Sequence, residues 1–190
     1  NSSKHELVED LGFKDRMVHV VPPGIDPKFS PGGAKSERPL VVAVGRLVPV
    51  KRFDLLVDVL ADVRAQHPTL EAVIVGEGYR RDEIESQIHA YGAQDWITLA
   101  GRVEDDELIS LYRRAWVLAS ASAREGWGMT LTEAAACGTP AVATRISGHE
   151  DLCSYKTTRL AAERAYAGCD RIAFAGKQLR RDIGWLARRS

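Results

Sequence analysis

Short apolar runs alternate with amphipathic stretches along most of this chain. Runs that read as strands occupy residues 40–44, 72–75, 97–99, 117–119 and 141–143. The stretches between them predict helices over residues 53–66, 81–91, 106–114 and 129–137. Strands that alternate with helices are typical of a parallel sheet covered on both faces. The sequence therefore predicts an α/β fold, a Rossmann-like doubly wound parallel sheet, preceded by a lead-in strand at 18–21.

Several polar residues follow the predicted strands, where sheets of this kind bind ligands at the carboxyl ends of their strands. Gly45, Gly76 and Glu125 all lie in strand-to-helix connections. Arg46 and Lys51 fall in the connection after the first strand, and two cations there could clamp a diphosphate, the arginine as a fork and the lysine as a point charge. The alternative is that Lys51 and Arg52 are solvated surface charges.

Two carboxylates eight positions apart, Glu125 and Glu133, flank a glycine-rich turn and a predicted helix start. Gly126 and Gly128 let the backbone pass close to a ligand, and a helix that begins near Met129 presents unpaired N–H groups to an anion. A diphosphate suits that helix start, and hydroxyl groups suit the carboxylates. A capping box is the alternative for Glu133, because residues 130–133 read Thr-Leu-Thr-Glu.

Residues 125–144 resemble the Glu-x7-Glu signature of the retaining glycosyltransferases of family 4. The resemblance extends over roughly residues 2–152, through Pro-Pro-Gly-Ile-Asp26, Val-Gly-Arg-Leu-Val-Pro-Val-Lys51, Val-Gly-Glu-Gly78 and Leu-Ala-Gly-Arg102. Pro23 departs from the family pattern, which usually has asparagine there. The resemblance implies the C-terminal, donor-binding half of a two-domain GT-B enzyme, which transfers a hexose from a nucleoside-diphosphate sugar with retention of configuration.

The resemblance also implies a role for each site residue. Arg46 and Lys51 would contact the donor phosphates and stabilise the leaving group, and Glu125 would face the transferred sugar. These three are the expected catalytic residues, and Glu133 would hold the ribose hydroxyls. The expected donor-binding set is Gly45, Arg46, Lys51, Gly76, Arg102, Val103, Glu125, Gly126, Trp127, Gly128, Met129, Thr130, Leu131 and Glu133, of which Arg102 and Val103 would frame the nucleobase. Leu131 is otherwise a core residue.

We expect no bound metal and no cofactor beyond the donor substrate. The acidic run at 104–107 is explained by the first turn of a helix, where the dipole favours carboxylates. Neither Gly76-Glu-Gly78 nor Gly126-Trp-Gly128 continues to the third glycine of a dinucleotide fingerprint. His149 is interpreted as a loop residue rather than a catalyst, whereas Glu150 resembles part of a family loop near the donor pocket.

The chain is expected to divide into three parts: residues 1–36 as lead-in and interdomain linker, 37–152 as the donor-binding domain, and 153–190 as a basic, helical tail. The last 35 residues carry nine Lys/Arg against three Asp/Glu. The tail resembles a βα unit of the family's acceptor domain, a unit that normally precedes a segment like residues 4–12, so a rearranged, spliced or incomplete chain stays open. The tail would belong to or dock on that acceptor domain, or contact a membrane as an interfacial helix.

Composition adds little. An odd number of cysteines, Cys137, Cys153 and Cys169, favours reduced thiols and a cytoplasmic protein, with peripheral contact at the inner face of the membrane as an option. We expect a nucleotide sugar and an acceptor-binding domain as partners, and no nucleic acid. Three functions stay open: a transferase half that is inactive alone, a non-catalytic nucleotide-sugar-binding module, and a membrane-docking fragment.

Overall fold

A five-stranded parallel sheet forms the centre of the computed structural model, which describes residues 2–146, 149 and 152. The strand order is β3-β2-β1-β4-β5. The strands are β1 (Leu40–Val44), β2 (Glu71–Val75), β3 (Ile97–Gly101), β4 (Val117–Ser120) and β5 (Ala141–Ala143). In the register of the sheet, Val41 of β1 pairs with Ala72 of β2 and with Val117 of β4.

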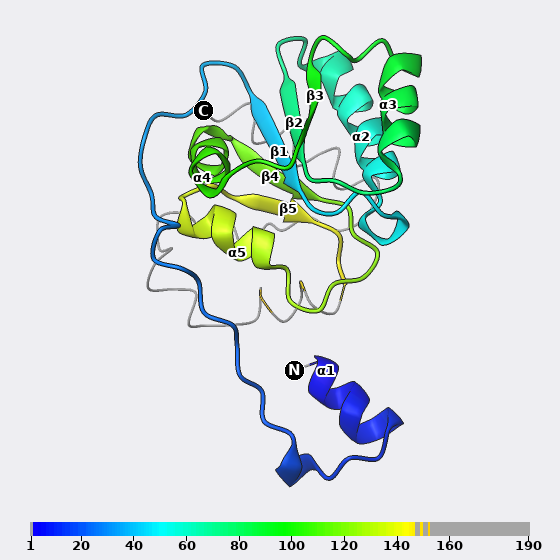
Figure 1. Ribbon diagram of the computed structural model, residues 1–190, viewed down its shortest axis with the longest axis vertical. Helices are drawn as coiled ribbons and strands as arrows, with labels where there is room; N and C mark the ends of the chain where they lie inside the picture. The colour runs from blue at the N-terminus through cyan, green and yellow to red at the C-terminus, as the bar shows by residue number, and fades with distance from the viewer. Residues whose placement is uncertain (1, 147–148, 150–151, 153–190) are drawn as a thin grey trace.

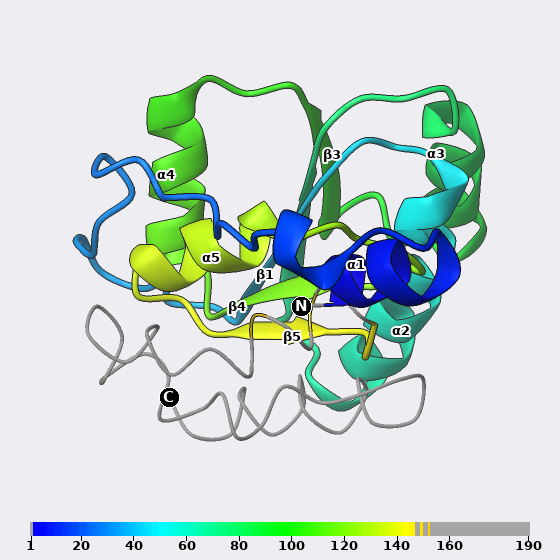
Figure 2. The ribbon, with the colours of Figure 1, turned by 90° about the horizontal axis from the view of Figure 1, so that it is seen from below.

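Two pairs of helices cover the sheet, one pair on each face (Figure 1). Helices α2 (Phe53–Gln66) and α3 (Arg81–Ala90) lie on one side, and α4 (Asp105–Arg114) and α5 (Met129–Ala136) lie on the other. Seen from below, the sheet runs between these two layers (Figure 2). The predicted doubly wound α/β fold is therefore confirmed.

The central strand β1 explains why both faces need a helical layer. Val41 and Ala43 are buried with the apolar residues of α2 and α3, whereas Leu40 and Val42 are buried with those of α4 and α5. Alternate side chains of a strand point to opposite faces, so an uninterrupted apolar strand requires cover on both sides. The two clusters of buried residues form the core of the domain.

The chain order creates a reversal beside β1. The chain builds β1, β2 and β3 outward in one direction, and then returns to place β4 and β5 on the other side of β1. The connections after β1 and β4 therefore leave the same edge of the sheet and turn toward opposite faces. A crevice between such connections is the usual ligand site of a doubly wound sheet.

The N-terminal segment lies mostly outside the body. It contains α1 (Ser2–His5), a π-helical turn (Glu6–Asp10) and a 3-10 turn (Asp15–Met17), and extends away from the sheet in Figure 1. The lead-in strand predicted at 18–21 is wrong, because this stretch is not paired with the sheet. Val21 is 82% exposed. None of the strands in the described part of the chain lies beside it, and a strand needs a neighbour with which to form backbone hydrogen bonds.

The end of this segment is held against the body by hydrogen bonds. The side chain of Arg113 donates to the Ser30 carbonyl oxygen at 2.8 Å, and the backbone N–H of Ser36 donates to the Arg114 carbonyl oxygen at 2.9 Å. The Trp116 indole N–H donates to the Ser36 carbonyl oxygen at 2.7 Å. Residues 30–36 therefore form part of the domain, although they precede its first strand.

Candidate functional site

Three backbone segments meet closely at the carboxyl edge of the sheet. The N–H of Leu47 donates to the carbonyl of Glu77 at 2.8 Å, and the N–H of Gly76 donates to that of Gly101 at 2.7 Å. A Cβ atom on Gly76 would lie 2.0 Å from the Gly45 carbonyl oxygen, and one on Gly78 would lie 2.2 Å from that of Leu47. Both glycines are therefore required by packing, whether or not Gly76 also contacts a ligand.

Lys51 is placed by a tight turn between β1 and α2. A 3-10 turn (Pro49–Lys51) ends there, and Arg52 adopts a left-handed conformation with φ of 51° before α2 begins. The aliphatic part of Lys51 lies over Gly45, where a Cβ atom would be 3.6 Å from the lysine Cδ. The lysine therefore runs back across the end of β1 and is 20% exposed at its side chain.

Glu125, in the connection after β4, contacts Lys51 of the connection after β1. The Lys51 ammonium forms an ion pair with Glu125 Oε1, and the Ser122 hydroxyl donates to the same oxygen at 2.8 Å. The Glu125 side chain is 15% exposed. A backbone hydrogen bond of 2.8 Å from Ala123 to Val50 joins the same two connections. The structure therefore brings these two predicted residues together.

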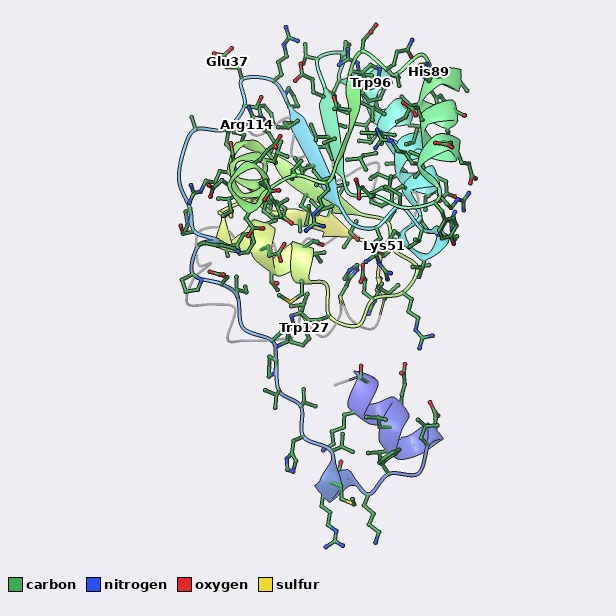
Figure 3. The ribbon with its side chains drawn as sticks, in the orientation of Figure 1. Glu37, Lys51, His89, Trp96, Arg114 and Trp127 are labelled. Carbon is green, nitrogen blue, oxygen red and sulfur yellow. The ribbon has the colours of Figure 1, made fainter. Side chains whose placement is uncertain are left out.

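Arg46, the other expected phosphate ligand, is arranged differently. It lies between β1 and the 3-10 turn, and its side chain is exposed. Among the described residues it forms no ion pair, in contrast to Lys51. Figure 3 shows Lys51 and Trp127 at one end of the domain, with Glu37 at the other. Arg46 is thus free to turn toward a ligand near Lys51.

The helix start after β4 is built on Gly128. This residue is the N-cap of α5 and has φ of 90°, and its carbonyl accepts from the N–H of Leu131 at 3.0 Å. A Cβ atom here would lie 3.0 Å from His149 Cδ2 and 3.1 Å from Leu152 Cδ1. The predicted start at Met129 is confirmed, and the N-cap of α5 provides no capping side chain, because Gly128 has none. Its first N–H groups are therefore left for another acceptor.

Glu133 does not close a capping box. Because α5 begins at Met129, Thr130 is not the N-cap, and the Glu133 carboxylate instead accepts a hydrogen bond from the Tyr112 hydroxyl at 2.9 Å. Burial raises the pKa of Glu133, an effect that the Tyr112 hydrogen bond opposes. Nearby Asp105 raises this pKa further and Lys28 lowers it. The capping-box alternative is therefore wrong.

The other expected donor-binding residues differ in exposure. Leu131 is 4% exposed and belongs to the core, so only its backbone could face a ligand. Val103 and Trp127 are half-buried against the α4 and α5 side of the core. Arg102 and Gly126 are exposed, Met129 is 36% exposed and Thr130 is half-buried. Glu150 lies outside the described residues.

Three polar residues near the site were not predicted to take part in it: Tyr112, Ser122 and His149. The interpretation of His149 as a loop residue is corrected, since it is helical and fully buried. Its Nδ1 donates to the Thr144 carbonyl oxygen at 2.8 Å, and burial lowers its pKa. Its Nε2 is buried and has no hydrogen-bond partner among the residues that the structure describes. Tyr112 follows Leu108 and Ile109 by four and three residues, so it falls on the apolar face of its helix, and a hydroxyl group on that face was the available sequence signal.

The acidic residues 105–107 form the first turn of α4, as expected. Over the part of the chain that the structure describes, no group of three His, Cys, Asp or Glu side chains could hold a metal ion. Cys137 is a buried free thiol, and Cys153 and Cys169 lie outside the described residues. In residues 2–146, 149 and 152, none of the helices has the length and apolar character needed to cross a bilayer.

The arrangement combines groups of opposite chemical use at one edge of the sheet. Lys51 and the uncapped start of α5 favour an anion, whereas Glu125 and Glu133 are acceptors that favour hydroxyl groups. These groups come from the connections that flank the reversal beside β1 and from α5 itself. A molecule that carries both phosphate and sugar groups matches this site.

Comparison with known proteins gives the same indication. A family model described as glycosyl transferases group 1 matches residues 25–165. Mannosylfructose-phosphate synthase of Agrobacterium fabrum is 31% identical over 176 residues, which cover 83% of this chain and 39% of that protein. A D-inositol 3-phosphate glycosyltransferase of Acidothermus cellulolyticus is 36% identical over 163 residues, 75% of this chain and 36% of that protein.

The fold has solved counterparts. HepE of Anabaena, solved in complex with UDP and glucose, superposes with a TM-score of 0.70 at 20% identity, over all of this chain and 61% of that one. This likeness shows the fold, a Rossmann-like domain of the GT-B architecture. This chain spans well under half the length of the two curated relatives. On the family match and these relatives, the chain belongs to the group 1 glycosyl transferases.

Proposed function

We propose that this chain is the donor-binding half of a retaining, family 4 glycosyltransferase that transfers a hexose from a nucleoside-diphosphate sugar to an acceptor. The observation that carries the proposal is the Lys51–Glu125 ion pair at the strand-order reversal, beside the start of α5. It joins a phosphate-binding cation to a hydroxyl-binding carboxylate at the usual ligand edge of such a sheet. A module that has lost catalysis need not keep Arg46, Lys51, Glu125 and Glu133 together.

The phosphates of the donor would lie between Lys51, Arg46 and the start of α5. Lys51 is held over Gly45 and Arg46 is exposed, so both can approach an anion from the β1 connection. The N–H groups of Met129 and Thr130, at the start of α5, would approach from the other side, with Leu131 next to them, whose N–H donates to the Gly128 carbonyl oxygen at 3.0 Å. Positive charge fixed at this position would stabilise the diphosphate as it leaves the sugar.

Glu125 would hold the transferred sugar. One of its carboxylate oxygens accepts from both Lys51 and Ser122, which fixes the orientation of the group. When the donor phosphates draw Lys51 toward them, the carboxylate can accept hydrogen bonds from sugar hydroxyls. Glu125, Arg46 and Lys51 are therefore the proposed catalytic residues.

The remaining donor contacts follow from position. Glu133 would accept hydrogen bonds from the ribose, and Arg102 and Val103, after β3, would frame the base. Gly45, Gly76, Gly126, Trp127 and Gly128 would line the site mainly through their backbone. Gly128 is well suited to this, since its positive φ exposes the helix start without a side chain.

We further propose that the acceptor is bound by a second domain, supplied by the longer protein of which chains like this one form part. We also propose that transfer needs no resident metal. The isolated chain is expected not to transfer sugar at an appreciable rate, because proximity between donor and acceptor supplies much of the acceleration. A cytoplasmic location is part of the proposal, to be checked by cell fractionation. The tail, 153–190, whose role as an interfacial or docking helix was predicted, lies outside the described residues.

Calorimetry with UDP, GDP and ADP tests the donor site. UDP is the first choice, because HepE was solved with UDP and with UDP-glucose. We expect one of the three nucleotides to bind the folded chain with a Kd below about 1 mM, or about −4 kcal/mol. Failure of all three nucleotides to bind at millimolar concentration would contradict the proposed donor site. Robust sugar transfer by the isolated chain would contradict the proposal that a second domain binds the acceptor.

A further inference from the structure

Tyr112 is a polar residue buried inside the layer of α4 and α5. Its exposed fraction is 0%, and it is among the largest fully buried side chains. A buried phenol needs a hydrogen-bond partner, and the hydroxyl donates to Glu133 Oε2 at 2.9 Å. This hydrogen bond connects the core to a residue of the proposed donor site.

Tyr112 is held by contacts to its ring and to its backbone. Phe29, from the segment before the sheet, lies with its ring centre 6.2 Å from that of Tyr112 and at 57° to it. The Tyr112 backbone carbonyl accepts a hydrogen bond from the buried Thr139 hydroxyl. Because both the ring and the backbone are fixed, the Tyr112 hydroxyl is a donor in a fixed position.

Charged and titratable groups surround Glu133 on each packed element. Asp105 lies at the start of α4, Lys28 comes from the N-terminal segment, and Cys137 follows α5. Lys28 is itself paired with Asp105 at 2.7 Å. Among these groups, the Tyr112 hydroxyl donates a hydrogen bond to Glu133. Burial raises the pKa of Tyr112, so the hydroxyl stays protonated.

We propose that Tyr112 is a positioning residue for nucleotide binding: its buried hydroxyl holds Glu133 Oε2, so that the other carboxylate oxygen is presented to the ribose hydroxyls of the donor. This inference rests on the proposed function, in which Glu133 holds the ribose. A glutamate on a helix surface otherwise samples several rotamers, and holding it in one before the ligand arrives lowers the entropic cost of binding.

Tyr112→Phe tests the inference with UDP and 2′,3′-dideoxy-UDP, or with the corresponding guanine nucleotides if GDP binds instead. In the wild-type chain, UDP is expected to bind about tenfold more tightly than the dideoxy analogue, since only UDP offers hydroxyls to Glu133. In Tyr112→Phe, this ratio is expected to fall toward one while affinity for the dideoxy analogue stays unchanged. A purely structural role would weaken both ligands equally and leave the ratio as it was.

The dependence of UDP affinity on pH gives a second readout. The Tyr112 hydrogen bond lowers the pKa of Glu133. UDP affinity should fall as pH is lowered and the Glu133 carboxylate takes up its proton. Without the Tyr112 hydrogen bond, this fall should occur at a higher pH. An unchanged pH profile in a folded Tyr112→Phe variant would overturn the positioning role. Phe29→Leu, which alters the packing but keeps the hydroxyl, is the matched control and should retain the profile.

A double-mutant comparison keeps the inference testable even if Tyr112→Phe is destabilised. If Tyr112 acts through Glu133, adding Tyr112→Phe to Glu133→Ala, which has no group for Tyr112 to hold, should leave the ratio of UDP to dideoxy-UDP affinity where Glu133→Ala alone puts it. Independent, additive losses would overturn the inference. If the wild-type chain binds none of the nucleotides, the proposed function fails as well, whereas normal binding with an unchanged ratio in Tyr112→Phe removes only the role of Tyr112.

Discussion

Lys51 and Glu125, 74 residues apart in the chain, form an ion pair across the point where the order of the strands reverses. Lys51 follows β1 and Glu125 follows β4, and these strands are neighbours in the sheet. A contact between residues so distant in sequence depends on the topology of the doubly wound fold. This topology also places the Lys51 ammonium and the Glu125 carboxylate at the carboxyl edge of the sheet, where doubly wound sheets usually bind ligands.

Lys51→Ala should weaken nucleoside diphosphate binding by about 10- to 100-fold, the equivalent of about 1.5–3 kcal/mol, because a charged hydrogen bond to phosphate is lost. Calorimetry with UDP measures the change. Arg38→Ala is the control, since Arg38 also forms an ion pair, at 2.9 Å with Glu71, but at the amino ends of the strands. Equal losses in both variants would indicate a general electrostatic effect instead of a phosphate contact.

Glu125→Gln, made in the intact two-domain enzyme, should reduce turnover by about 100-fold while UDP affinity changes little. The glutamine can still accept from Ser122, but it has no charge with which to bind the developing cation or orient sugar hydroxyls. Steady-state rates, together with UDP titration, separate the two effects. A loss confined to UDP affinity would place Glu125 at the phosphates and contradict its assignment to the sugar.

Gly78→Ala should lower the free energy of unfolding by about 1–3 kcal/mol or more, because its Cβ atom would lie 2.6 Å from the Leu47 carbonyl carbon. Denaturant unfolding followed by circular dichroism measures the loss. Gly24→Ala is the matched control, since nothing lies within 4 Å of a Cβ atom there. Comparable stabilities of the two variants would show that the turns after β1 and β2 can separate at little cost.

Glu133→Gln should stabilise the chain at pH 7 by about 0.5–1 kcal/mol while weakening UDP binding. Because burial raises the pKa of Glu133 above 4.5, the folded chain keeps this proton over a pH range in which the unfolded chain has lost it. The stability that the protonated carboxyl contributes is therefore present below pH 4.5 and is lost as pH rises through the folded pKa.

Glutamine does not titrate, and its side-chain oxygen can still accept a hydrogen bond from Tyr112. The variant therefore avoids the loss of stability that the wild type shows as pH rises. Thermal unfolding of the wild type and the variant between pH 4 and pH 8 tests this. At about pH 4 the difference in stability between the two proteins should have largely vanished. A variant less stable than the wild type at pH 7 would show that the Glu133 charge is favourable in the fold.

Most of the fold could be predicted, because the period of the apolar residues is local. The strand at 40–44 and the helix at 53–66 have the predicted bounds, and Leu56, Val59, Leu60 and Val63 of that helix are buried as their spacing indicates. The lead-in strand failed for a physical reason. Residues 18–21 have strand-like composition, but a strand also requires a partner, and composition does not supply one.

The candidate site was predictable in part. The residues after β1 and β4 could be named, since parallel strands of such a sheet present their carboxyl ends together. The partner of Glu133 could not, because Thr-Leu-Thr-Glu fits a capping box only if Thr130 is the N-cap and the helix begins at Leu131. Gly128 starts the helix earlier, and Glu133 then faces Tyr112 of α4. Tyr112 shares the apolar face of that helix, so the pattern predicts that it is a core residue but does not identify it as the partner of Glu133.

The sequence by itself determined the strands, the helices and the residue types that follow each strand, because these depend on short-range periodicity and on glycine positions. Only the tertiary structure decided which of them meet. The ion pair of Lys51 with Glu125, the hydrogen bond of Tyr112 to Glu133 and the burial of His149 behind Gly128 each join separate segments. Such contacts depend on how layers pack and where the strand order reverses, which no local pattern encodes.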